Sequence, residues 1–219
     1  MTGVAAALAD VRERISVAAR DVSRDADAVR LVAATKMVPA ARVAEAVALG
    51  VPDIGENRAQ ELLAKAQELD AHASTAAAAR WHFLGRLQRN KVRSLAARVT
   101  WWQSVDREAL GAAIARHAPG ARILVEVNLA GEPQKGGCAP GDAARLVDAL
   151  RHEDLRVEGL MTIPPAGDDP RRWFAALREL AADLGVHELS MGMTDDFEAA
   201  VAEGATMVRV GRAIFGARA

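Results

Sequence analysis

The apolar positions of the chain alternate between a helical spacing and short continuous runs. The first apolar residues recur at helical spacing, at Val4, Leu8, Val11, Ile15 and Val22. This period predicts an amphipathic helix at the start of the chain. A short apolar run over 30–34 (RLVAA) then predicts a strand, and Pro39 favours the first turn of a helix that Gly50 ends. The chain therefore begins with a helix, followed by one strand-helix unit.

The same alternation continues to the end of the chain. Further apolar runs predict strands at 51–54, 81–84, 99–105, 122–129, 155–161, 187–191 and 205–210. Segments with a helical period lie at 58–69, 87–97, 107–117, 142–151, 170–184 and 195–203. The residues at predicted N-cap positions are Asn57, Asp106, Asp169 and Thr194, and the glycines at predicted helix ends are Gly185 and Gly204.

Repeated strand-helix units indicate an α/β protein with a parallel sheet. Eight units of about 25–30 residues predict a (β/α)8 TIM barrel, whose usual size is about 250 residues, with an extra N-terminal helix. A doubly wound open sheet is the alternative with the same alternation. No repeat, low-complexity tract or long linker divides the sequence, so we expect residues 1–219 to form a single domain.

Composition and charge narrow the class of protein. The 219 residues are 51% hydrophobic, enough to bury a core. The 28 basic and 29 acidic residues give a net charge of -1, so no overall field favours nucleic acid or an anionic membrane. Charged residues interrupt the first 20 positions, where a signal peptide would be apolar, and no segment has the roughly 20 apolar residues of a membrane span. We therefore expect a cytoplasmic protein without a membrane partner.

Cysteine, histidine and tyrosine limit the possible chemistry. Cys138 is the only cysteine, which excludes an intramolecular disulfide and a Cys-rich zinc site and fits a reducing compartment. The five histidines show no paired ligand spacing, so we expect no metal site. The chain contains no tyrosine, which excludes a mechanism with a tyrosine acid or base.

In a parallel barrel, functional side chains lie where the strands end. The residues at these positions are Lys36, Glu56, Asn57, Gly85, Ser104, Asn128, Met161, Thr162, Ser190, Gly192, Met193, Thr194, Arg209, Gly211 and Arg212. Lys36 directly follows the first strand. Desolvation or a neighbouring cation such as Arg209 would lower its pKa and free an amine that condenses with an aldehyde. The alternative is a solvated surface lysine.

Two glycine-containing segments follow the last two predicted strands, SMGMTDD at 190–196 and VRVGRAIFG at 208–216. In barrels, phosphate often binds between these two loops, at the start of a short extra helix. Backbone amides, hydroxyl groups and Arg212 could hold the anion here. The alternative is ordinary loop and helix-cap chemistry. An imine-forming lysine across one barrel end from a phosphate site indicates pyridoxal 5'-phosphate.

Motifs over residues 29–217 resemble those of a known family. They are LVAATKMVPA, DIGENRAQE, WHFLGRLQRNK, SVDR, VNLAGEPQKGG, GLMTIP, LSMGMTDDFEAAVAEGATMVRVG and AIFG. In combination they resemble the pyridoxal phosphate homeostasis proteins of the YggS/PROSC type, which are related to the alanine racemase N-terminal domain. The resemblance implies an alanine racemase N-terminal domain-like barrel that binds pyridoxal 5'-phosphate (PLP). It also implies a role in intracellular vitamin B6 and amino-acid homeostasis.

The resemblance assigns roles to individual residues. Lys36 forms the Schiff base with PLP, Arg209 faces the pyridine nitrogen, and Asn57 lies close to the ring. The residues it implies around the phosphate are Ser190, Gly192, Met193, Thr194, Gly211 and Arg212. The chain departs from the family pattern at Arg58, where many relatives have Tyr, at Thr194, where Ser is commoner, and at Arg212, which replaces a small hydroxyl residue.

Arg209 bears on catalysis. A guanidinium that donates to the ring nitrogen disfavours a pyridinium and weakens the cofactor as an electron sink. A racemase of the related family uses a second base, a tyrosine from another domain, which this chain lacks. We therefore expect a monomeric PLP carrier that passes PLP to PLP-dependent apo-enzymes, without substantial turnover. The alternatives are an amino-acid racemase, a lyase that uses Lys36, and a nucleic-acid-binding protein that uses the basic run 86–98.

Overall fold

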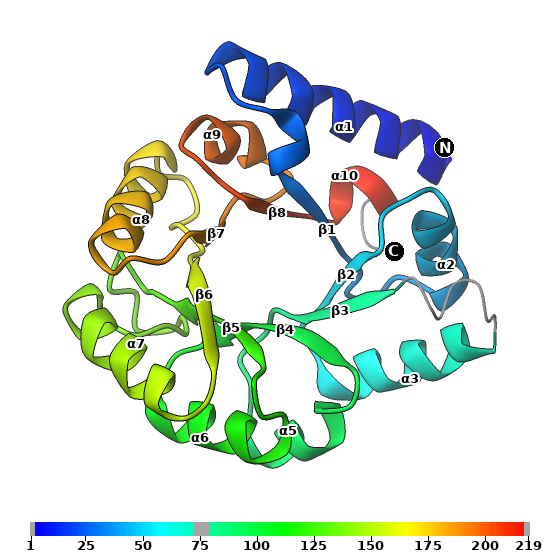
Figure 1. Cartoon of the computed structure of the whole chain (residues 1–219). Helices are drawn as coiled ribbons and strands as arrows, with labels where there is room; N and C mark the ends of the chain where they lie inside the picture. The colour runs from blue at the N-terminus through cyan, green and yellow to red at the C-terminus, as the bar shows by residue number, and fades with distance from the viewer. Residues whose placement is uncertain (1–2, 72–78, 217–219) are drawn as a thin grey trace.

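The computed structural model describes residues 3–71 and 79–216, which form one closed barrel of parallel strands (Figure 1). The strands are β1 (Arg30–Ala34), β2 (Asp53–Glu56), β3 (Arg80–Phe83), β4 (Val99–Val105), β5 (Arg122–Glu126), β6 (Arg156–Met161), β7 (Glu188–Ser190) and β8 (Met207–Val210). Each strand pairs with the next along the chain, and β8 pairs with β1. The predicted (β/α)8 barrel is confirmed, and the open sheet is excluded.

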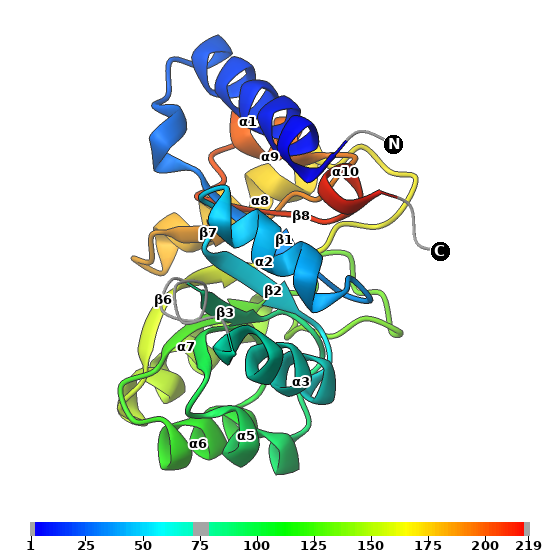
Figure 2. The same ribbon diagram turned by 90° about the vertical axis from the view of Figure 1, so that its right-hand side faces the viewer.

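Helices surround the strands as an outer ring (Figures 1 and 2). They are α1 (Val4–Asp21), α2 (Ala40–Ala48), α3 (Ala59–Asp70), α5 (Arg89–Leu95), α6 (Glu108–His117), α7 (Ala143–His152), α8 (Arg171–Asp183), α9 (Phe197–Ala202) and α10 (Arg212–Phe215). Two 3-10 segments, η1 (Ala26–Ala28) and η2 (Pro140–Asp142), were not predicted from the pattern, nor was α10. Within the described ranges, every helix is too short or too polar for a bilayer crossing.

The extra N-terminal helix, α1, lies outside the ring (Figure 2). Its apolar stripe, from Val4 to Ala19, is buried against α9, α10 and α2. Burial of this stripe, rather than helix propensity alone, stabilises the helix in this place. An ion pair between Arg14 and Glu198 adds a polar contact between α1 and α9. The helix therefore covers the last units of the barrel, which carry the predicted phosphate site.

The helix ends follow the predicted glycines, but the predicted N-caps are wrong. Gly185 and Gly204 follow α8 and α9 with positive φ angles of 62° and 104°, as expected for helix ends. The N-cap residues are Arg58, Arg107, Pro170 and Asp196, instead of Asn57, Asp106, Asp169 and Thr194. The polar side chains have other partners: Asp106 pairs with the Arg107 guanidinium, and the Thr194 hydroxyl accepts from the Ala213 amide.

Side chains fill the barrel interior near the N-terminal ends of the strands. A small inner cluster consists of Val32, Trp101, Leu124, Met161 and Met207. The Trp101 ring stacks on the imidazole of His82, with the centroids 5.9 Å apart. The guanidinium groups of Arg30 and Arg122, at the starts of β1 and β5, lie 5.1 and 5.3 Å from the Trp101 ring centroid. These side chains form a floor, so a ligand site is expected at the opposite, C-terminal end, which we call the mouth.

Candidate functional site

The predicted site residues fall on adjacent strands of the barrel. Ser190 ends β7, Arg209 lies in β8, Lys36 follows β1, and Asn57 follows β2. Because the strand order places β7, β8, β1 and β2 side by side, the loops that follow these strands meet at one sector of the mouth. Of the remaining predicted residues, Gly192, Met193 and Thr194 lie in the loop after β7, Gly211 directly follows β8, and Arg212 begins α10.

The turn that carries Lys36 is held in place by neighbouring elements. Lys36 is half-buried, one residue beyond the fully buried Thr35. Met37, the next residue, has a φ angle of 63°, a left-handed conformation that is unfavourable for a residue with a side chain. The backbone amide of Met37 donates a hydrogen bond to the carboxylate of Glu61 on α3. This contact fixes the backbone immediately after Lys36.

A cluster of buried charged side chains also contacts the turn that carries Lys36. The Lys65 ammonium donates to the Glu56 carboxylate and to the Thr35 carbonyl, each at 2.6 Å, and to Glu61 at 2.8 Å. The Thr35 hydroxyl also donates to Glu56, at 2.6 Å. Burial raises the pKa of Glu56, although the hydrogen bonds from Lys65 and Thr35 oppose the rise. The cluster was missed from the sequence, because Lys65 appears there as a surface residue of a helix.

Arg209 is a buried cation with fixed partners. It is 4% exposed, and its guanidinium donates to the Ser190 hydroxyl at 2.7 Å and to the Thr162 carbonyl at 2.9 Å. Burial lowers the pKa of Arg209 to about 10, and Glu126 and Asp196 oppose the fall. The group therefore remains protonated at neutral pH. Among the predicted site residues, Arg209 is the most deeply buried cation.

The loops after β7 and β8 leave backbone donors free. Among the described residues, the amides of Gly192, Thr194 and Gly211 donate to no protein acceptor. Gly192 has a φ angle of 89°, and a Cβ there would lie 2.5 Å from the Cβ of Ala200. Only glycine therefore fits this bend. The free N–H groups offer the chemistry that binds phosphate.

Two of the residues that were predicted to surround the phosphate, Met193 and Arg212, bond to neighbouring acidic side chains. The Arg212 guanidinium pairs with the carboxylate of Asp195, and both side chains are exposed. Met193 is exposed, and its amide donates to the Asp196 carboxylate at 2.5 Å. Asp196 therefore bonds the backbone of the loop between β7 and α9, and the ion pair between Asp195 and Arg212 joins this loop to α10.

Asn57 lies at the edge of a separate cavity of about 770 Å³ at the mouth. The cations that line it are Arg58, Arg86, Lys91 and Arg107.

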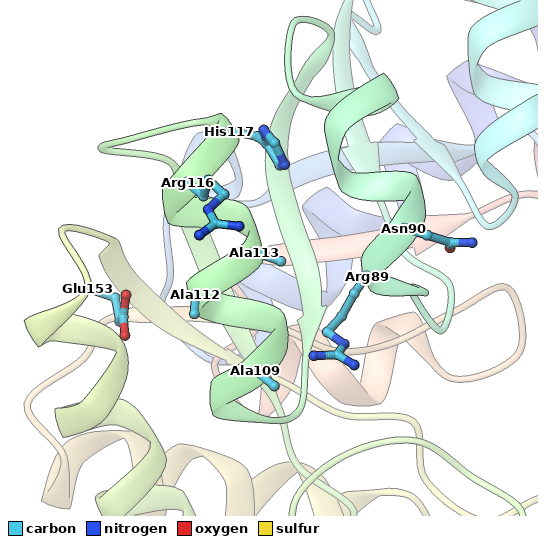
Figure 3. A pocket seen from close by; sticks show the side chains of 8 residues that line it. All are labelled: Arg89, Asn90, Ala109, Ala112, Ala113, Arg116, His117 and Glu153. Atoms are coloured by element: carbon cyan, nitrogen blue, oxygen red, sulfur yellow. The ribbon is translucent and has the colours of Figure 1, made fainter.

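A second groove of similar volume runs outside the barrel between α5 and α6 (Figure 3), and Arg89, Arg116 and Glu153 are among its lining residues. The predicted basic run is thus divided: Arg86 and Lys91 face the mouth cavity, and Arg89 faces the outer groove. In the described part of the chain, no His, Cys, Asp and Glu cluster could hold a metal ion.

Glu126 is a buried acid at the mouth that the sequence analysis did not select. It ends β5 and is 8% exposed. Burial, with a contribution from Asp106, raises the pKa of Glu126 to about 7, and Arg209 and Arg86 oppose the rise. Its signal in the sequence is an acidic residue within the apolar run 122–129, at a position whose side chain faces the barrel interior.

A Glu126→Gln variant should be more stable than the wild type at pH 8, by about 2 kcal/mol. The Glu126 carboxyl has a higher pKa in the folded state than the usual value of about 4.3. Protonation of this carboxyl therefore favours the folded state, fully so at pH values below about 4.3. This contribution is lost as the pH rises through about 7. Urea unfolding between about pH 5 and pH 8 measures the difference. The exposed Glu153→Gln variant is the control, and parallel stability profiles for Glu126→Gln and wild type would contradict the prediction.

Comparison with known proteins extends over the whole chain. The family model of the alanine racemase N-terminal domain matches residues 7–219. A pyridoxal phosphate homeostasis protein from Pseudomonas aeruginosa is 43% identical over 228 aligned residues, which cover 100% of this chain and 97% of the relative. The protein of the same name from Escherichia coli is 35% identical, with 100% of this chain and 98% of the relative covered.

Solved structures give the same result for the fold. PipY of Synechococcus elongatus, solved with PLP bound, superposes with a TM-score of 0.84 at 36% identity and covers 97% of this chain and 100% of its own. Alanine racemase from Corynebacterium glutamicum superposes with a TM-score of 0.67 at 17% identity, and only 61% of that enzyme is covered. The racemase therefore shares the barrel fold with this chain and extends beyond it.

Proposed function

Because the chain belongs to the pyridoxal phosphate homeostasis proteins, within the alanine racemase N-terminal domain family, we propose that it binds PLP at the barrel mouth. In this function it holds PLP as a Schiff base and takes part in intracellular vitamin B6 and amino-acid homeostasis. One observation carries the proposal: Lys36 and the buried Arg209 follow or lie on neighbouring strands, beside loops with free amides.

The donor groups of the mouth match the chemistry of PLP. The Lys36 amine would bind the aldehyde carbon, with the carbonyl oxygen leaving as water. The free amides of Gly192, Thr194 and Gly211, with Met193 and Arg212 around them, would hold the phosphate. Ser190 would lie beside it without donating its hydroxyl hydrogen, which goes to Gln103. Arg209 uses two of its five N–H donors within the described residues, which leaves donors for the pyridine nitrogen. Asn57 would contact the ring from the β2 side.

The permanent charge of Arg209 also disfavours efficient catalysis. Its pKa of about 10 keeps the guanidinium charged at neutral pH, so it acts as a donor to the ring nitrogen and not as a proton source. The cofactor would then lack the protonated ring that stabilises carbanions. The chain also has no tyrosine for a second base. We therefore propose a carrier without substantial turnover, which acts as a cytoplasmic monomer and passes PLP to PLP-dependent apo-enzymes.

Spectroscopy with added PLP tests the proposal. The wild-type protein should become yellow, and borohydride should remove the colour and leave a pyridoxyl label on Lys36, detected by peptide mass spectrometry. A protein that stays colourless at millimolar PLP, or a label on another lysine, would contradict the assignment. The racemase alternative is tested by chiral analysis of alanine after long incubation with the PLP-loaded protein. Substantial PLP-dependent racemisation would overturn the carrier proposal.

A further inference from the structure

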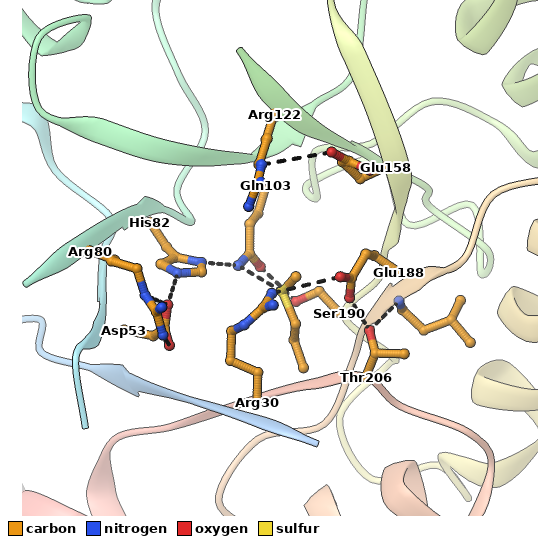
Figure 4. Close-up of polar contacts among 12 residues, drawn as sticks. Arg30, Asp53, Arg80, His82, Gln103, Arg122, Glu158, Glu188, Ser190 and Thr206 are labelled. Carbon is orange, nitrogen blue, oxygen red and sulfur yellow. Dashed lines mark hydrogen bonds and ion pairs between the residues drawn. The ribbon is translucent and has the colours of Figure 1, made fainter. Parts of the chain in front are cut away.

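Polar side chains inside the barrel form one continuous hydrogen-bonded chain, which we name the relay. Its members are Arg209, Ser190, Gln103, His82 and Asp53, from β8, β7, β4, β3 and β2, each at most 4% exposed. The donor-acceptor distances, in that order, are 2.7, 2.6, 2.6 and 2.8 Å. Figure 4 shows the lower part of the relay, with His82 between Asp53 and Gln103. The relay therefore joins the floor of the barrel to Arg209.

The donors and acceptors of the relay have one consistent direction. A guanidinium can only donate, so Ser190 accepts from Arg209 and gives its own hydrogen to the carbonyl oxygen of Gln103. The amide nitrogen of Gln103 then donates to Nδ1 of His82, which must carry no hydrogen. The hydrogen of the neutral imidazole is consequently on Nε2, from which it is donated to the Asp53 carboxylate.

The opposite orientation of the Gln103 amide does not fit the buried charges. Its oxygen would then face Nδ1 of His82, which would need a hydrogen there. A neutral His82 would in that case turn the lone pair of Nε2 towards the Asp53 carboxylate, a repulsive contact. Burial lowers the pKa of His82, although the hydrogen bond that His82 donates to Asp53 opposes the fall, so the doubly protonated imidazole is also disfavoured. The charge on Asp53 therefore sets the orientation of Gln103.

The lower end of the relay is a fixed anion. Arg80 donates to both carboxylate oxygens of Asp53, at 2.9 and 2.5 Å. Burial alone would raise the pKa of Asp53, but the hydrogen bonds from His82 and Arg80 outweigh it and the pKa lies below its ordinary value. Asp53 is therefore ionised at neutral pH. Since the anion cannot donate, the direction of every hydrogen bond above it is determined.

We propose that Asp53, His82 and Gln103 are positioning residues that hold the Arg209 guanidinium at the cofactor site through Ser190. They fix the Ser190 hydroxyl as an acceptor towards Arg209, and the Thr162 carbonyl holds the second guanidinium nitrogen. The remaining donors of Arg209 are thereby kept for one ligand orientation. The consequence for PLP rests on the proposed function, but the direction of the relay does not.

The direction is tested without cofactor, by NMR of protein labelled with 15N-histidine. At neutral pH, His82 should be neutral, with its hydrogen on Nε2. In a Gln103→Glu variant, the donor to Nδ1 is replaced by an acceptor, so Nδ1 of His82 should acquire a hydrogen. A wild-type His82 with its hydrogen on Nδ1, or an unchanged imidazole in Gln103→Glu, would overturn the assigned direction.

The positioning role is tested with Gln103→Leu and His82→Phe, which keep approximate side-chain size while they interrupt the relay. Hydrogen exchange at the Arg209 guanidinium of the PLP-free protein should accelerate at least about tenfold in both variants, because the acceptor Ser190 is no longer fixed. In the PLP-loaded protein, the dissociation constant for PLP should rise about tenfold and the absorption maximum should shift. His82→Phe retains a ring against Trp101, so stacking is preserved.

Thr206→Val provides the matched control. Thr206 bonds the Leu189 amide and the Glu188 carboxylate between β7 and β8, outside the relay. The Thr206→Val variant should have lower thermal stability, but the hydrogen exchange rate of the Arg209 guanidinium and the PLP spectrum should not change. Relay variants that fold and keep wild-type exchange at Arg209 would overturn the positioning role. If wild-type protein shows no PLP band, the proposed function fails, while the two NMR measurements still decide the inference.

Discussion

A Lys36→Ala variant should bind PLP about 100-fold more weakly than wild type and should show no Schiff base absorption at all. Lys36 is the lysine that the turn after β1 presents at the mouth, beside β8 and Arg209. Removal of its amine removes the covalent bond, but it leaves the amides of the loops after β7 and β8 to hold the phosphate. Residual binding should therefore be non-covalent and insensitive to borohydride. Titration of PLP, followed by absorbance and by equilibrium dialysis, separates the two modes.

Lys91→Ala is the matched control for this experiment. Lys91 also lies near the mouth, in the cavity beside Asn57, but on α5 and away from β1. Its loss should leave the Schiff base band intact and change PLP affinity by less than about threefold. A Lys36→Ala protein with the wild-type spectrum would move the attachment to another lysine. That outcome would remove the basis of the site assignment.

The second large effect concerns stability: Lys65→Met should lower the free energy of unfolding by about 3–5 kcal/mol. The variant leaves the carboxylate of Glu56, which is 0% exposed, without its cation. Because burial raises the pKa of Glu56, protonation relieves the unpaired charge as the pH falls. The stability deficit should consequently shrink from neutral towards acidic pH. Urea unfolding at several pH values measures both the deficit and its slope.

Two comparison variants make this result specific. Arg98→Met removes an exposed ion pair with Asp70 and should cost less than about 1 kcal/mol. Addition of Glu56→Gln to Lys65→Met removes the buried charge and should recover part of the lost stability. A Lys65→Met protein that is no less stable than Arg98→Met would show that the buried pair contributes little.

The alternation of apolar runs was sufficient to predict the barrel, because each parallel strand is buried on both faces. β1 and β4 have the predicted limits, 30–34 and 99–105. β2 was placed at 51–54 and lies at Asp53–Glu56, since it has an acidic residue on each face, Asp53 towards His82 in the barrel and Glu56 towards Lys65 of α3, and these interrupt the apolar pattern. The positions at and just after the strand ends placed Lys36, which follows β1, beside Arg209, which lies in the neighbouring strand β8. Their roles in binding stay a prediction.

Partners across the barrel could not be predicted in the same way. The relay joins Gln103 to His82, 21 positions away, and to Ser190, 87 positions away. Such pairs depend on strand tilt and register in the closed barrel, which no local pattern contains. In the sequence, Gln103 and Glu126 are polar residues within largely apolar strands. A polar residue at an inward position of a barrel strand is the signal that could have identified them.

The floor formed by Trp101 between Arg30 and Arg122 has a consequence for how a carrier would unload. A small molecule bound at the mouth would enter and leave through that opening, because the buried side chains of Trp101, His82 and Gln103 fill the barrel interior beneath it. A recipient protein would then have to approach the face from which the vitamin was loaded, and while it remained there it would obstruct refilling. Delivery and recharging would therefore alternate, and the dwell time of the recipient would limit how often one molecule could serve.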